Sequence, residues 1–261
     1  MTTPSSSAQA DSARTLPVGI WLRMYLRLFA VQGSWNYETM LGNGIAFATE
    51  PALRLLPGGI DGQAYSEALG RQAKYFNAHP YLAGVAVGAL ARAELDGVPA
   101  PMIERFRTAL GGPLGSVGDR LVWASWLPLC SLIALGAFGL GARPVRVIAI
   151  FLVTYNLGHF ILRAWGLRVG FQRGLRVADA LGHPVLRRGP QYVGTAAALL
   201  AGITIPLAAR EVIGGGRTLA AEIILLAMAG GVLLARFGGR FEGWRLSLAI
   251  LALFVLFSVI R

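Results

Sequence analysis

The chain has 261 residues, of which 55% are hydrophobic and only 14% are charged, and its mean hydropathy is +0.57. Because ordinary soluble domains carry about 25% charged residues, this composition indicates a protein embedded in a membrane. The net charge of +11 comes almost entirely from arginines in short gaps between apolar runs. No continuous basic face remains for nucleic acid, and the single cysteine, Cys130, excludes an intrachain disulfide and a cysteine metal site.

The N-terminal segment differs from the rest of the chain in being polar. Residues 1–17 lack the apolar core of a secretory signal, so we expect a disordered cytoplasmic tail. Residues 18–30, "VGIWLRMYLRLFA", alternate arginine with bulky apolar residues, and Arg23 and Arg27 share one helical face. This pattern predicts an amphipathic helix lying at a membrane surface, and a helix that docks onto a partner fits it as well.

Short helices and turns are predicted for the remainder of an N-terminal region that we place at 18–120. Residues 36–56 and 64–77 are expected to form amphipathic helices separated by the turn "LPGGIDG". The apolar stretch 76–91 is too short to cross a bilayer, which favours a re-entrant hairpin or a half-span buried in protein. Gly84 and Gly88 within it have the four-residue spacing that lets helices approach closely.

The stretch 111–123, "GGPLGSVGDRLVW", has two opposed interpretations. A phosphate-binding loop needs a lysine after its last glycine and a preceding strand, and neither is present. We therefore predict broken-helix backbone at 111–118, of the kind that meets polar substrates inside transporters. Asp119 would then be a substrate acceptor, although capping a helix that begins at Arg120 and pairing with a nearby arginine explain it equally well.

A second predicted break carries two polar side chains, Asn77 and His79, in "FNAHP". Pro80 disfavours helical backbone at His79, so both side chains are candidates for substrate contact, while Asn77 would alternatively satisfy free backbone ends. The three histidines, His79, His159 and His183, are scattered, and we assign no metal site and no cofactor. No Ser/His/Asp triad, paired acids or Cys/His pair stands out, so we assign no catalytic residue.

The region 121–261 is expected to form about five transmembrane helices of a bundle. Arginine-rich gaps at 163–190 and 236–245 are placed in the cytoplasm, which puts the N-terminus inside and the C-terminus outside. Within the second span, Asn156, His159 and Arg163 lie on one helical face as a membrane polar cluster, either as contacts between helices or lining a cavity. The five predicted spans are 121–142, 144–162, 191–209, 219–235 and 244–260.

Three stretches resemble the IID component of the mannose-family bacterial phosphotransferase system (PTS). They are "GSWNYETMLGNGIAFATEPALRLL" at 33–56, "FNAHPYLAGVAVG" at 76–88 and "GGPLGSVGDRLVW" at 111–123. The family pattern runs roughly Q-G-S-W-N-[FY]-E-x-M, F-N-[TS]-x-P and M-G-P-L-A-G-[IV]-G-D. The resemblance implies that Trp35, Asn36 and Glu38 belong with Asn77, His79 and Asp119 to a substrate-binding or translocation site.

The same resemblance implies an all-α, multi-span protein of the bacterial inner membrane that pairs with a IIC subunit. The pair would translocate a hexose or amino sugar, coupled to its phosphorylation by IIA and IIB, and would assemble as a trimer of IIC–IID pairs in the lipid bilayer. His79 would not be phosphorylated. Departures such as Gly111 before Gly-Pro and Arg120 after Asp119 leave open a transport-inactive homologue with a regulatory or structural role. A membrane enzyme with a lone catalytic Asp119 is a third reading.

Overall fold

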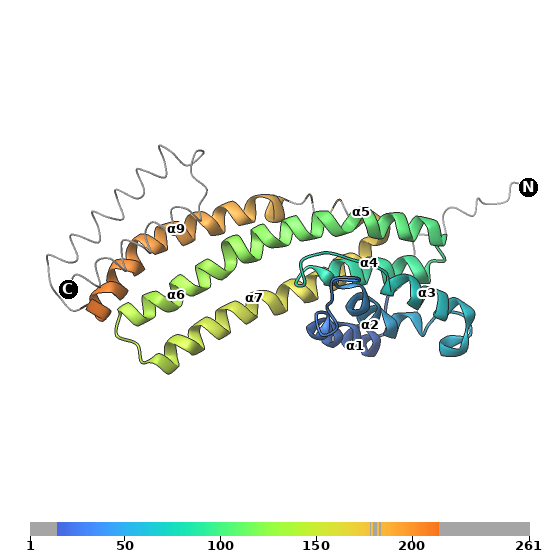
Figure 1. The fold of residues 1–261 in the computed structure, drawn as a ribbon, viewed down its shortest axis with the longest axis horizontal. Helices are drawn as coiled ribbons and strands as arrows, with labels where there is room; N and C mark the ends of the chain where they lie inside the picture. Colours follow the sequence, from blue (N-terminus) through green and yellow to red (C-terminus); the bar gives the residue numbers. More distant parts are fainter. Residues whose placement is uncertain (1–14, 178, 180–181, 183, 214–261) are drawn as a thin grey trace, which may run out of the picture.

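The computed structural model describes residues 15–177, 179, 182 and 184–213, and every regular element in this part of the chain is a helix (Figure 1). Residues 1–14 of the predicted tail at 1–17 and the last two predicted spans lie outside the described residues. The helices are α1 (Val18–Arg27), η1 (Leu28–Ala30), α2 (Gly42–Leu53), η2 (Gly59–Asp61), α3 (Gln63–Ala73), α4 (Ala83–Leu95), α5 (Ala100–Gly118), the π-helix η3 (Asp119–Trp126), α6 (Leu127–Gly139), α7 (Pro144–Arg173), η4 (Gly174–Val177) and α9 (Pro184–Ile213).

Three helical stretches are long and apolar enough to cross a membrane. They run from Ala100 to Gly139, from Pro144 to Val177 and from Leu186 to Glu211, with 40, 34 and 26 residues. At about 1.5 Å per residue each exceeds the roughly 30 Å of a hydrocarbon core. The first three predicted spans are therefore confirmed as apolar helices. Figure 1 shows α6, α7 and α9 running lengthwise, with α6 packed against both of the others.

The remaining helices, α1 to α4, form a lobe at one end of the long helices (Figure 1). Helix α4 is its centre, because nearly all of its residues are buried. It packs against α7 through small residues: a side chain at Gly88 would overlap the backbone of α7 at Leu167, and one at Gly170 would overlap the backbone of α4 at Val85. The predicted close approach at Gly84 and Gly88 is confirmed, and so is the burial of this short apolar segment in protein.

A buried carboxylate ties α1, α2 and α3 together inside the lobe. Glu50 accepts hydrogen bonds from Arg27 (2.6 Å), Arg54 (2.5 Å) and Tyr65 (3.0 Å). Burial alone would raise the pKa of Glu50, but the three donors outweigh it and hold that pKa below its usual value. The predicted helix at 18–30 is confirmed, with Met24 buried, while Leu22 and Leu26 of the same helix stay exposed.

Two predictions about where helices are interrupted are wrong. The stretch 111–118 is not a break, because α5 continues through it, Pro113 included, into η3 and α6. Close packing of its glycines on residues 77–79 offsets their poor helix propensity. The predicted loop at 163–190 is also largely helical, because α7 extends to Arg173 as it docks on α4.

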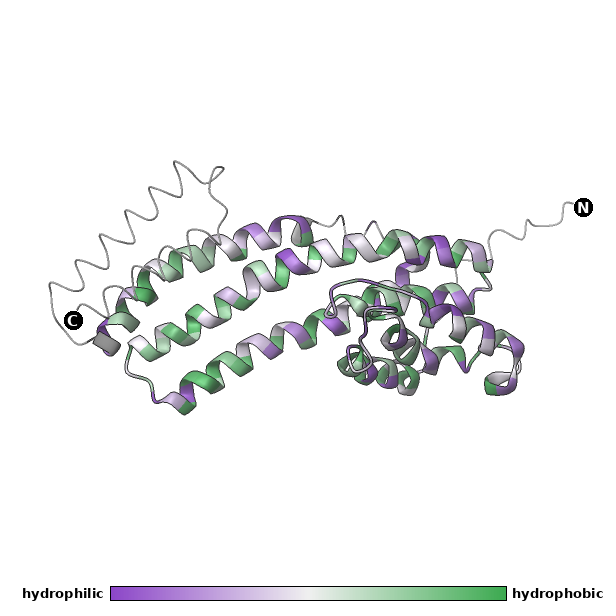
Figure 2. Cartoon of the chain, viewed as in Figure 1, coloured by the Kyte–Doolittle hydropathy of each residue, from purple (hydrophilic) through white to green (hydrophobic). Residues whose placement is uncertain are grey.

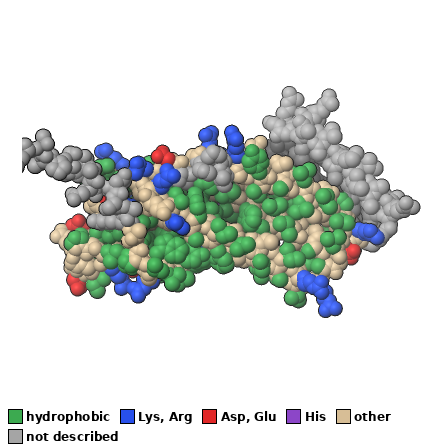
Figure 3. Space-filling model, turned by 180° about the vertical axis from the view of Figure 1, so that it is seen from behind, with side chains coloured by type: hydrophobic (Ala, Val, Ile, Leu, Met, Phe, Trp, Pro, Cys, Tyr) green, Lys and Arg blue, Asp and Glu red, His purple; other side chains and the backbone are tan. Residues whose placement is uncertain are grey.

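Exposed hydrophobic side chains lie both on the lobe and along α7 and α9. Colouring by hydropathy shows mostly hydrophobic residues along α6 and the adjoining part of α7, whereas the lobe mixes hydrophilic and hydrophobic ones (Figure 2). From behind, hydrophobic side chains cover most of the face, and charged ones lie mainly along its edges and ends (Figure 3). We call the exposed hydrophobic side chains along α7 and α9 the apolar belt; on α7 they include Ile148, Leu152, Val153 and Leu157. Such a surface suits contact with lipid or with a membrane partner.

Candidate functional site

The three segments that carry the sequence motifs meet in the structure. The backbone N–H of Leu41 donates to the carbonyl of Phe76 (2.9 Å), and that of Phe76 donates to the carbonyl of Thr39 (3.1 Å). On the other side, a Cβ at Gly111 would lie 2.8 Å from the carbonyl oxygen of Asn77, and one at Gly118 would overlap the side chain of His79. We call residues 36–41, 76–81 and 118–126 together the motif junction.

The first segment of the motif junction is a turn organised by Asn36. Its Oδ1 accepts the backbone N–H groups of Glu38 (2.9 Å) and Thr39 (2.8 Å), and its Nδ2 donates to the Ser34 carbonyl and the Thr39 hydroxyl. Asn36 is thus occupied within the loop, and its described contacts are those of an Asx turn. The side chains of Trp35 and Glu38 are exposed beside it.

His79 is the buried centre of the motif junction, with 2% of its surface exposed. Its Nδ1 accepts the backbone N–H of Tyr81 (3.2 Å), which assigns the proton of the neutral ring to Nε2. Nε2 has no hydrogen-bond partner among the described residues. Burial lowers the pKa of His79 from 6.5 to about 4, since it outweighs the opposite effect of the Asp119 charge. The ring is therefore neutral and offers one free N–H donor.

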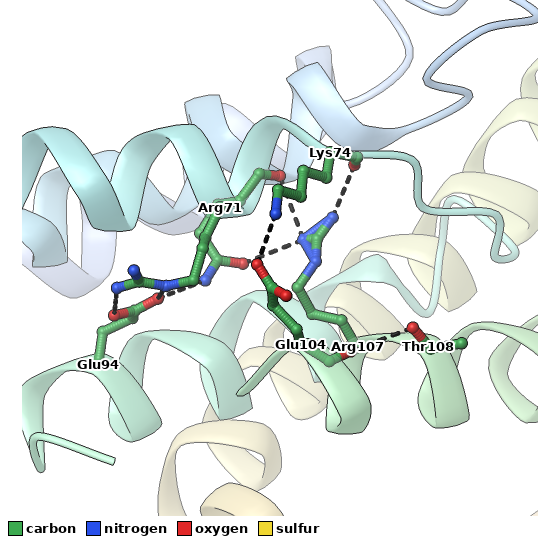
Figure 4. A network of polar contacts seen from close by, with 7 residues as sticks. Arg71, Lys74, Glu94, Glu104, Arg107 and Thr108 are labelled. Atoms are coloured by element: carbon green, nitrogen blue, oxygen red, sulfur yellow. Dashed lines mark hydrogen bonds and ion pairs between the residues drawn. The ribbon is translucent and has the colours of Figure 1, made fainter. Parts of the chain in front are cut away.

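The segment that leads into His79 is held by a second buried side chain. Arg107 of α5 donates to the carbonyl of Gln72 (3.3 Å), the side-chain oxygen of Gln72 (3.2 Å) and the carbonyl of Lys74 (2.7 Å). Figure 4 shows this contact beside the ion pairs Arg71–Glu94 and Lys74–Glu104. The guanidinium also lies 5.3 Å from the centre of the Phe76 ring. Arg107 thereby fixes the end of α3 and the start of the 75–82 loop.

Aromatic rings continue from His79 to α7. His79 lies 5.2 Å from both the Tyr81 and Trp123 rings, and Tyr81 stacks on His159 at 4.4 Å. The hydroxyl groups of Tyr81 and Tyr155 are 2.9 Å apart. Both ring nitrogens of His159 lack a partner among the described residues. Together with Phe29 and Arg163 these residues form what we call the aromatic cluster (Phe29, His79, Tyr81, Trp123, Tyr155, His159 and Arg163).

Arg163 is the buried charge of the aromatic cluster. Its guanidinium donates to the carbonyl of Leu28 and lies 5.0 Å from the ring centres of both Phe29 and Tyr81. No carboxylate of a described residue lies within ion-pair distance of it. Ring faces and one carbonyl therefore replace water around this cation. Arg163 ties the start of η1 to α7 and closes one side of the cluster.

A pocket of about 680 Å³ lies beside the aromatic cluster, between η3, α7 and α9. Tyr81 and His159 reach its wall, which is otherwise mostly apolar and includes Val122, Trp126 and Trp165. Aromatic faces with a few polar edges in an apolar pocket suit a neutral ligand rich in hydroxyl groups. Sequence reasoning did not predict four of the residues in the aromatic cluster, namely Phe29, Tyr81, Trp123 and Tyr155. The helical spacing could have indicated Tyr155, because it precedes His159 by four residues on α7.

The structure brings together some of the predicted site residues and not others. Asp119 is the first residue of η3, close enough for its charge to act on His79, and its side chain is exposed. It neither caps a helix nor forms an ion pair with a described residue. Asn77 is exposed next to His79. Asn156 stands apart from the cluster, because its side chain donates to the Leu152 carbonyl of its own helix.

The known proteins that resemble this chain include several IID components of the PTS. A family model described as "PTS system mannose/fructose/sorbose family IID component" matches residues 20–205. The mannose-specific EIID component of Escherichia coli K12 is 29% identical over 171 residues, which are 63% of this chain and 59% of that protein. The sorbose-specific EIID component of Klebsiella pneumoniae is 31% identical over 176 residues, 65% and 62% of the two chains. The match thus spans about three fifths of these relatives' length.

Solved structures support the same fold. A chain of the cryo-EM structure of the mannose transporter ManYZ with microcin E492 aligns with a TM-score of 0.56 at 18% identity, covering 95% of this chain and 98% of that one. A structure described as a membrane protein aligns at 0.68 with 21% identity and the same coverage. With three apolar helices, the chain is an all-α protein of the bacterial inner membrane. The matched family model covers most of the sequence, and the chain belongs to the mannose/fructose/sorbose family of PTS IID components.

Proposed function

We propose that this chain acts with a IIC subunit to translocate a hexose or amino sugar, which is phosphorylated by IIA and IIB as it enters the cell. The observation that carries the proposal is the convergence of the three motif segments on His79 and the aromatic cluster. The meeting of these segments at one buried point supports placing the contact with sugar or with the partner subunit there. The relatives named for mannose and sorbose indicate the substrate class.

The chemistry of the motif junction supports a sugar in particular. Asp119 supplies an exposed acceptor, the buried Nε2–H of His79 is a donor with no partner among the described residues, and Trp123 is an exposed ring 5.2 Å from the ring of His79. Carboxylates and donors bind sugar hydroxyls, and aromatic faces bind the C–H faces of the ring. In this account Trp35, Asn36 and Glu38 form the adjoining loop, and His79 carries no phosphoryl group.

Assembly and orientation complete the proposal. The exposed apolar belt on α7 and α9 would contact lipid and the IIC subunit, in a trimer of IIC–IID pairs. The arginine-rich end of α7, next to the lobe, would face the cytoplasm by the positive-inside rule. The N-terminus would then be inside and, with five spans, the C-terminus outside.

A second candidate function is a membrane homologue that keeps the IID scaffold for regulation and has lost transport. Arg120 favours it, because this exposed cation directly follows the exposed Asp119 in η3 and would compete with a neutral sugar for the carboxylate if the two side chains paired during transport.

Uptake separates the two candidates. Cells that lack their own mannose-family permease would express IIC, IIA and IIB proteins from the same organism as this chain, with and without the chain itself. We expect radiolabelled mannose, fructose, sorbose or glucosamine to accumulate in phosphorylated form only when the chain is present. Equal accumulation without it, or none with it despite normal membrane levels of both subunits, would support the transport-inactive homologue.

A further inference from the structure

A second pocket, distant from the motif junction along α7, lies where that helix ends. It has a volume of about 980 Å³ and is bounded by the start of α1, the end of α4, the end of α7 and η4. Four arginines line it, Arg92, Arg168, Arg173 and Arg176, together with one carboxylate, Asp96. None of these side chains belongs to the motif junction or to the aromatic cluster, although Arg173 also reaches the wall of the first pocket.

The charge of this pocket is not balanced by the described part of the chain. Arg92 is engaged already, because its Nε lies 2.5 Å from the carboxylate of Asp96. Arg168, Arg173 and Arg176 are exposed, and no carboxylate of a described residue lies within ion-pair distance of them. Four arginines against one acid leave three positive charges in one concave site. Guanidinium groups grouped in this way bind phosphate strongly.

One side of the same pocket is apolar. Leu16, Val18 and Trp21 of the N-terminal segment and Phe171 and Leu175 of the α7–η4 end contribute to its wall. Trp21 is half-buried and stacks on Tyr25 with ring centres 5.3 Å apart. A tryptophan beside arginines, at the end of an apolar helix, is typical of the level at which lipid headgroups lie. A soluble anion would gain nothing from these apolar side chains.

We propose that this pocket binds an anionic phospholipid, with its phosphate held by Arg168, Arg173 and Arg176 and its glycerol and upper acyl chain against Val18, Trp21 and Leu175. Basic pockets next to membrane helices on the cytoplasmic side recognise such headgroups. The lipid would join α1 to the end of α7. It would fix the lobe to the membrane surface without any part in sugar binding.

Native mass spectrometry of the full chain, purified in mild detergent with the subunits that accompany it, tests the proposal. Phosphatidylglycerol and phosphatidylcholine are added separately. We expect the wild type to retain phosphatidylglycerol in preference to phosphatidylcholine. Changing Arg168, Arg173 and Arg176 together to Gln should weaken retention roughly a hundredfold, because each such arginine contributes a factor of about five. The control changes Arg143, Arg146 and Arg210, which are exposed at the other end of the long helices, to Gln and should bind as the wild type does.

Other outcomes overturn the proposal. Equal retention by the wild type and the Arg168/Arg173/Arg176 variant, or equal retention of the two lipids, would place no anionic lipid in the pocket. Release of the lipid by millimolar inorganic phosphate would indicate a site for soluble anions. Loss of an accompanying soluble protein with unchanged lipid binding would indicate an acidic protein surface as the ligand. If the triple Gln variant cannot be purified, Arg176→Gln alone should weaken retention about fivefold, and the triple change to Lys should preserve it.

Discussion

At the scale of single residues, His79 shows what the sequence can and cannot predict. Pro80 correctly predicts non-helical backbone at His79, because the rule concerns adjacent residues only. The rings next to it come from residues 81 and 123, and Tyr81 in turn stacks on His159; no local pattern links positions 123 and 159 to His79. The same holds for Arg163: its helical spacing from Asn156 and His159 could be read from the sequence, but its contacts with Phe29 and Tyr81 could not.

The buried, neutral His79 makes stability depend on pH. The unfolded chain takes up the proton near pH 6.5 and the folded chain only near pH 4, so between these values the unfolded state binds more protons. Stability therefore falls with decreasing pH in this window, by up to about 1.4 kcal/mol per pH unit. Thermal unfolding of the wild type and of His79→Gln, compared at several pH values between 4.5 and 7, measures this. Identical pH dependence in both proteins would show that His79 is not a buried neutral group.

Gly118 is required because its backbone lies against the ring of His79. We expect Gly118→Ala to displace that ring and to destabilise the protein by about 1–3 kcal/mol, the usual cost of overpacking, and to lower sugar uptake as well. Gly112→Ala is the matched control, since the same helix has open space there. Melting temperatures in detergent and uptake rates measure both effects. A Gly118→Ala protein as stable and as active as Gly112→Ala would contradict the packing described for His79.

At the scale of elements, the glycine-rich stretch shows how packing overrides local propensity. Four glycines and Pro113 between 111 and 118 predict a broken helix, yet one helix of 40 residues runs from Ala100 to Gly139. Gly111, Gly115 and Gly118 lie against residues 77–79 instead of forming a turn, while Gly112 faces open space. The irregularity comes after the glycines, as the π-helix η3, which begins at Asp119. π-helical segments within α-helices are frequent at functional sites. The glycine, proline and hydropathy patterns of the sequence do not predict where such a segment begins.

Arg107 tests how firmly α5 holds the loop that carries His79. Arg107→Met would leave the Gln72 and Lys74 carbonyls without their donor and should cost about 2–4 kcal/mol of stability, as expected when a buried charged partner is removed. Arg105→Met makes the same chemical change at an exposed position two residues away and should have little effect. The melting temperature and the rate of protease cleavage within the 75–82 loop measure the effect of each substitution. If both variants cleave and melt alike, Arg107 does not hold the loop.

At the scale of the whole molecule, hydropathy predicts the long apolar helices well because lipid imposes length and composition on each segment separately. It predicts the lobe poorly. The arginines at 163, 168 and 173 suggest a loop, whereas α7 continues through them because it docks on α4. That contact joins segments about 80 residues apart in sequence, and only the four-residue glycine spacing in α4 pointed to it.

The proposed orientation places the α6–α7 connection outside the cell and the lobe inside. In a Cys130→Ala background, which removes the only cysteine, a single cysteine at Ala142 should react with an impermeant maleimide in intact cells. A cysteine at Gln63 in the lobe should react only after permeabilisation. The reverse pattern would invert the topology.

The most direct test of the account is the rate at which phosphorylated sugar accumulates when Asp119 loses its charge. Asp119→Asn should reduce the rate about tenfold, the effect of losing one charge-assisted hydrogen bond of roughly 1.5 kcal/mol, at unchanged membrane levels. Asn77→Ala should also reduce it. Asp61→Asn, the same change at an exposed acid of the lobe away from the motif junction, should leave the rate as in the wild type. Wild-type rates for Asp119→Asn and Asn77→Ala together would show that the motif junction shapes the helices and takes no part in sugar passage.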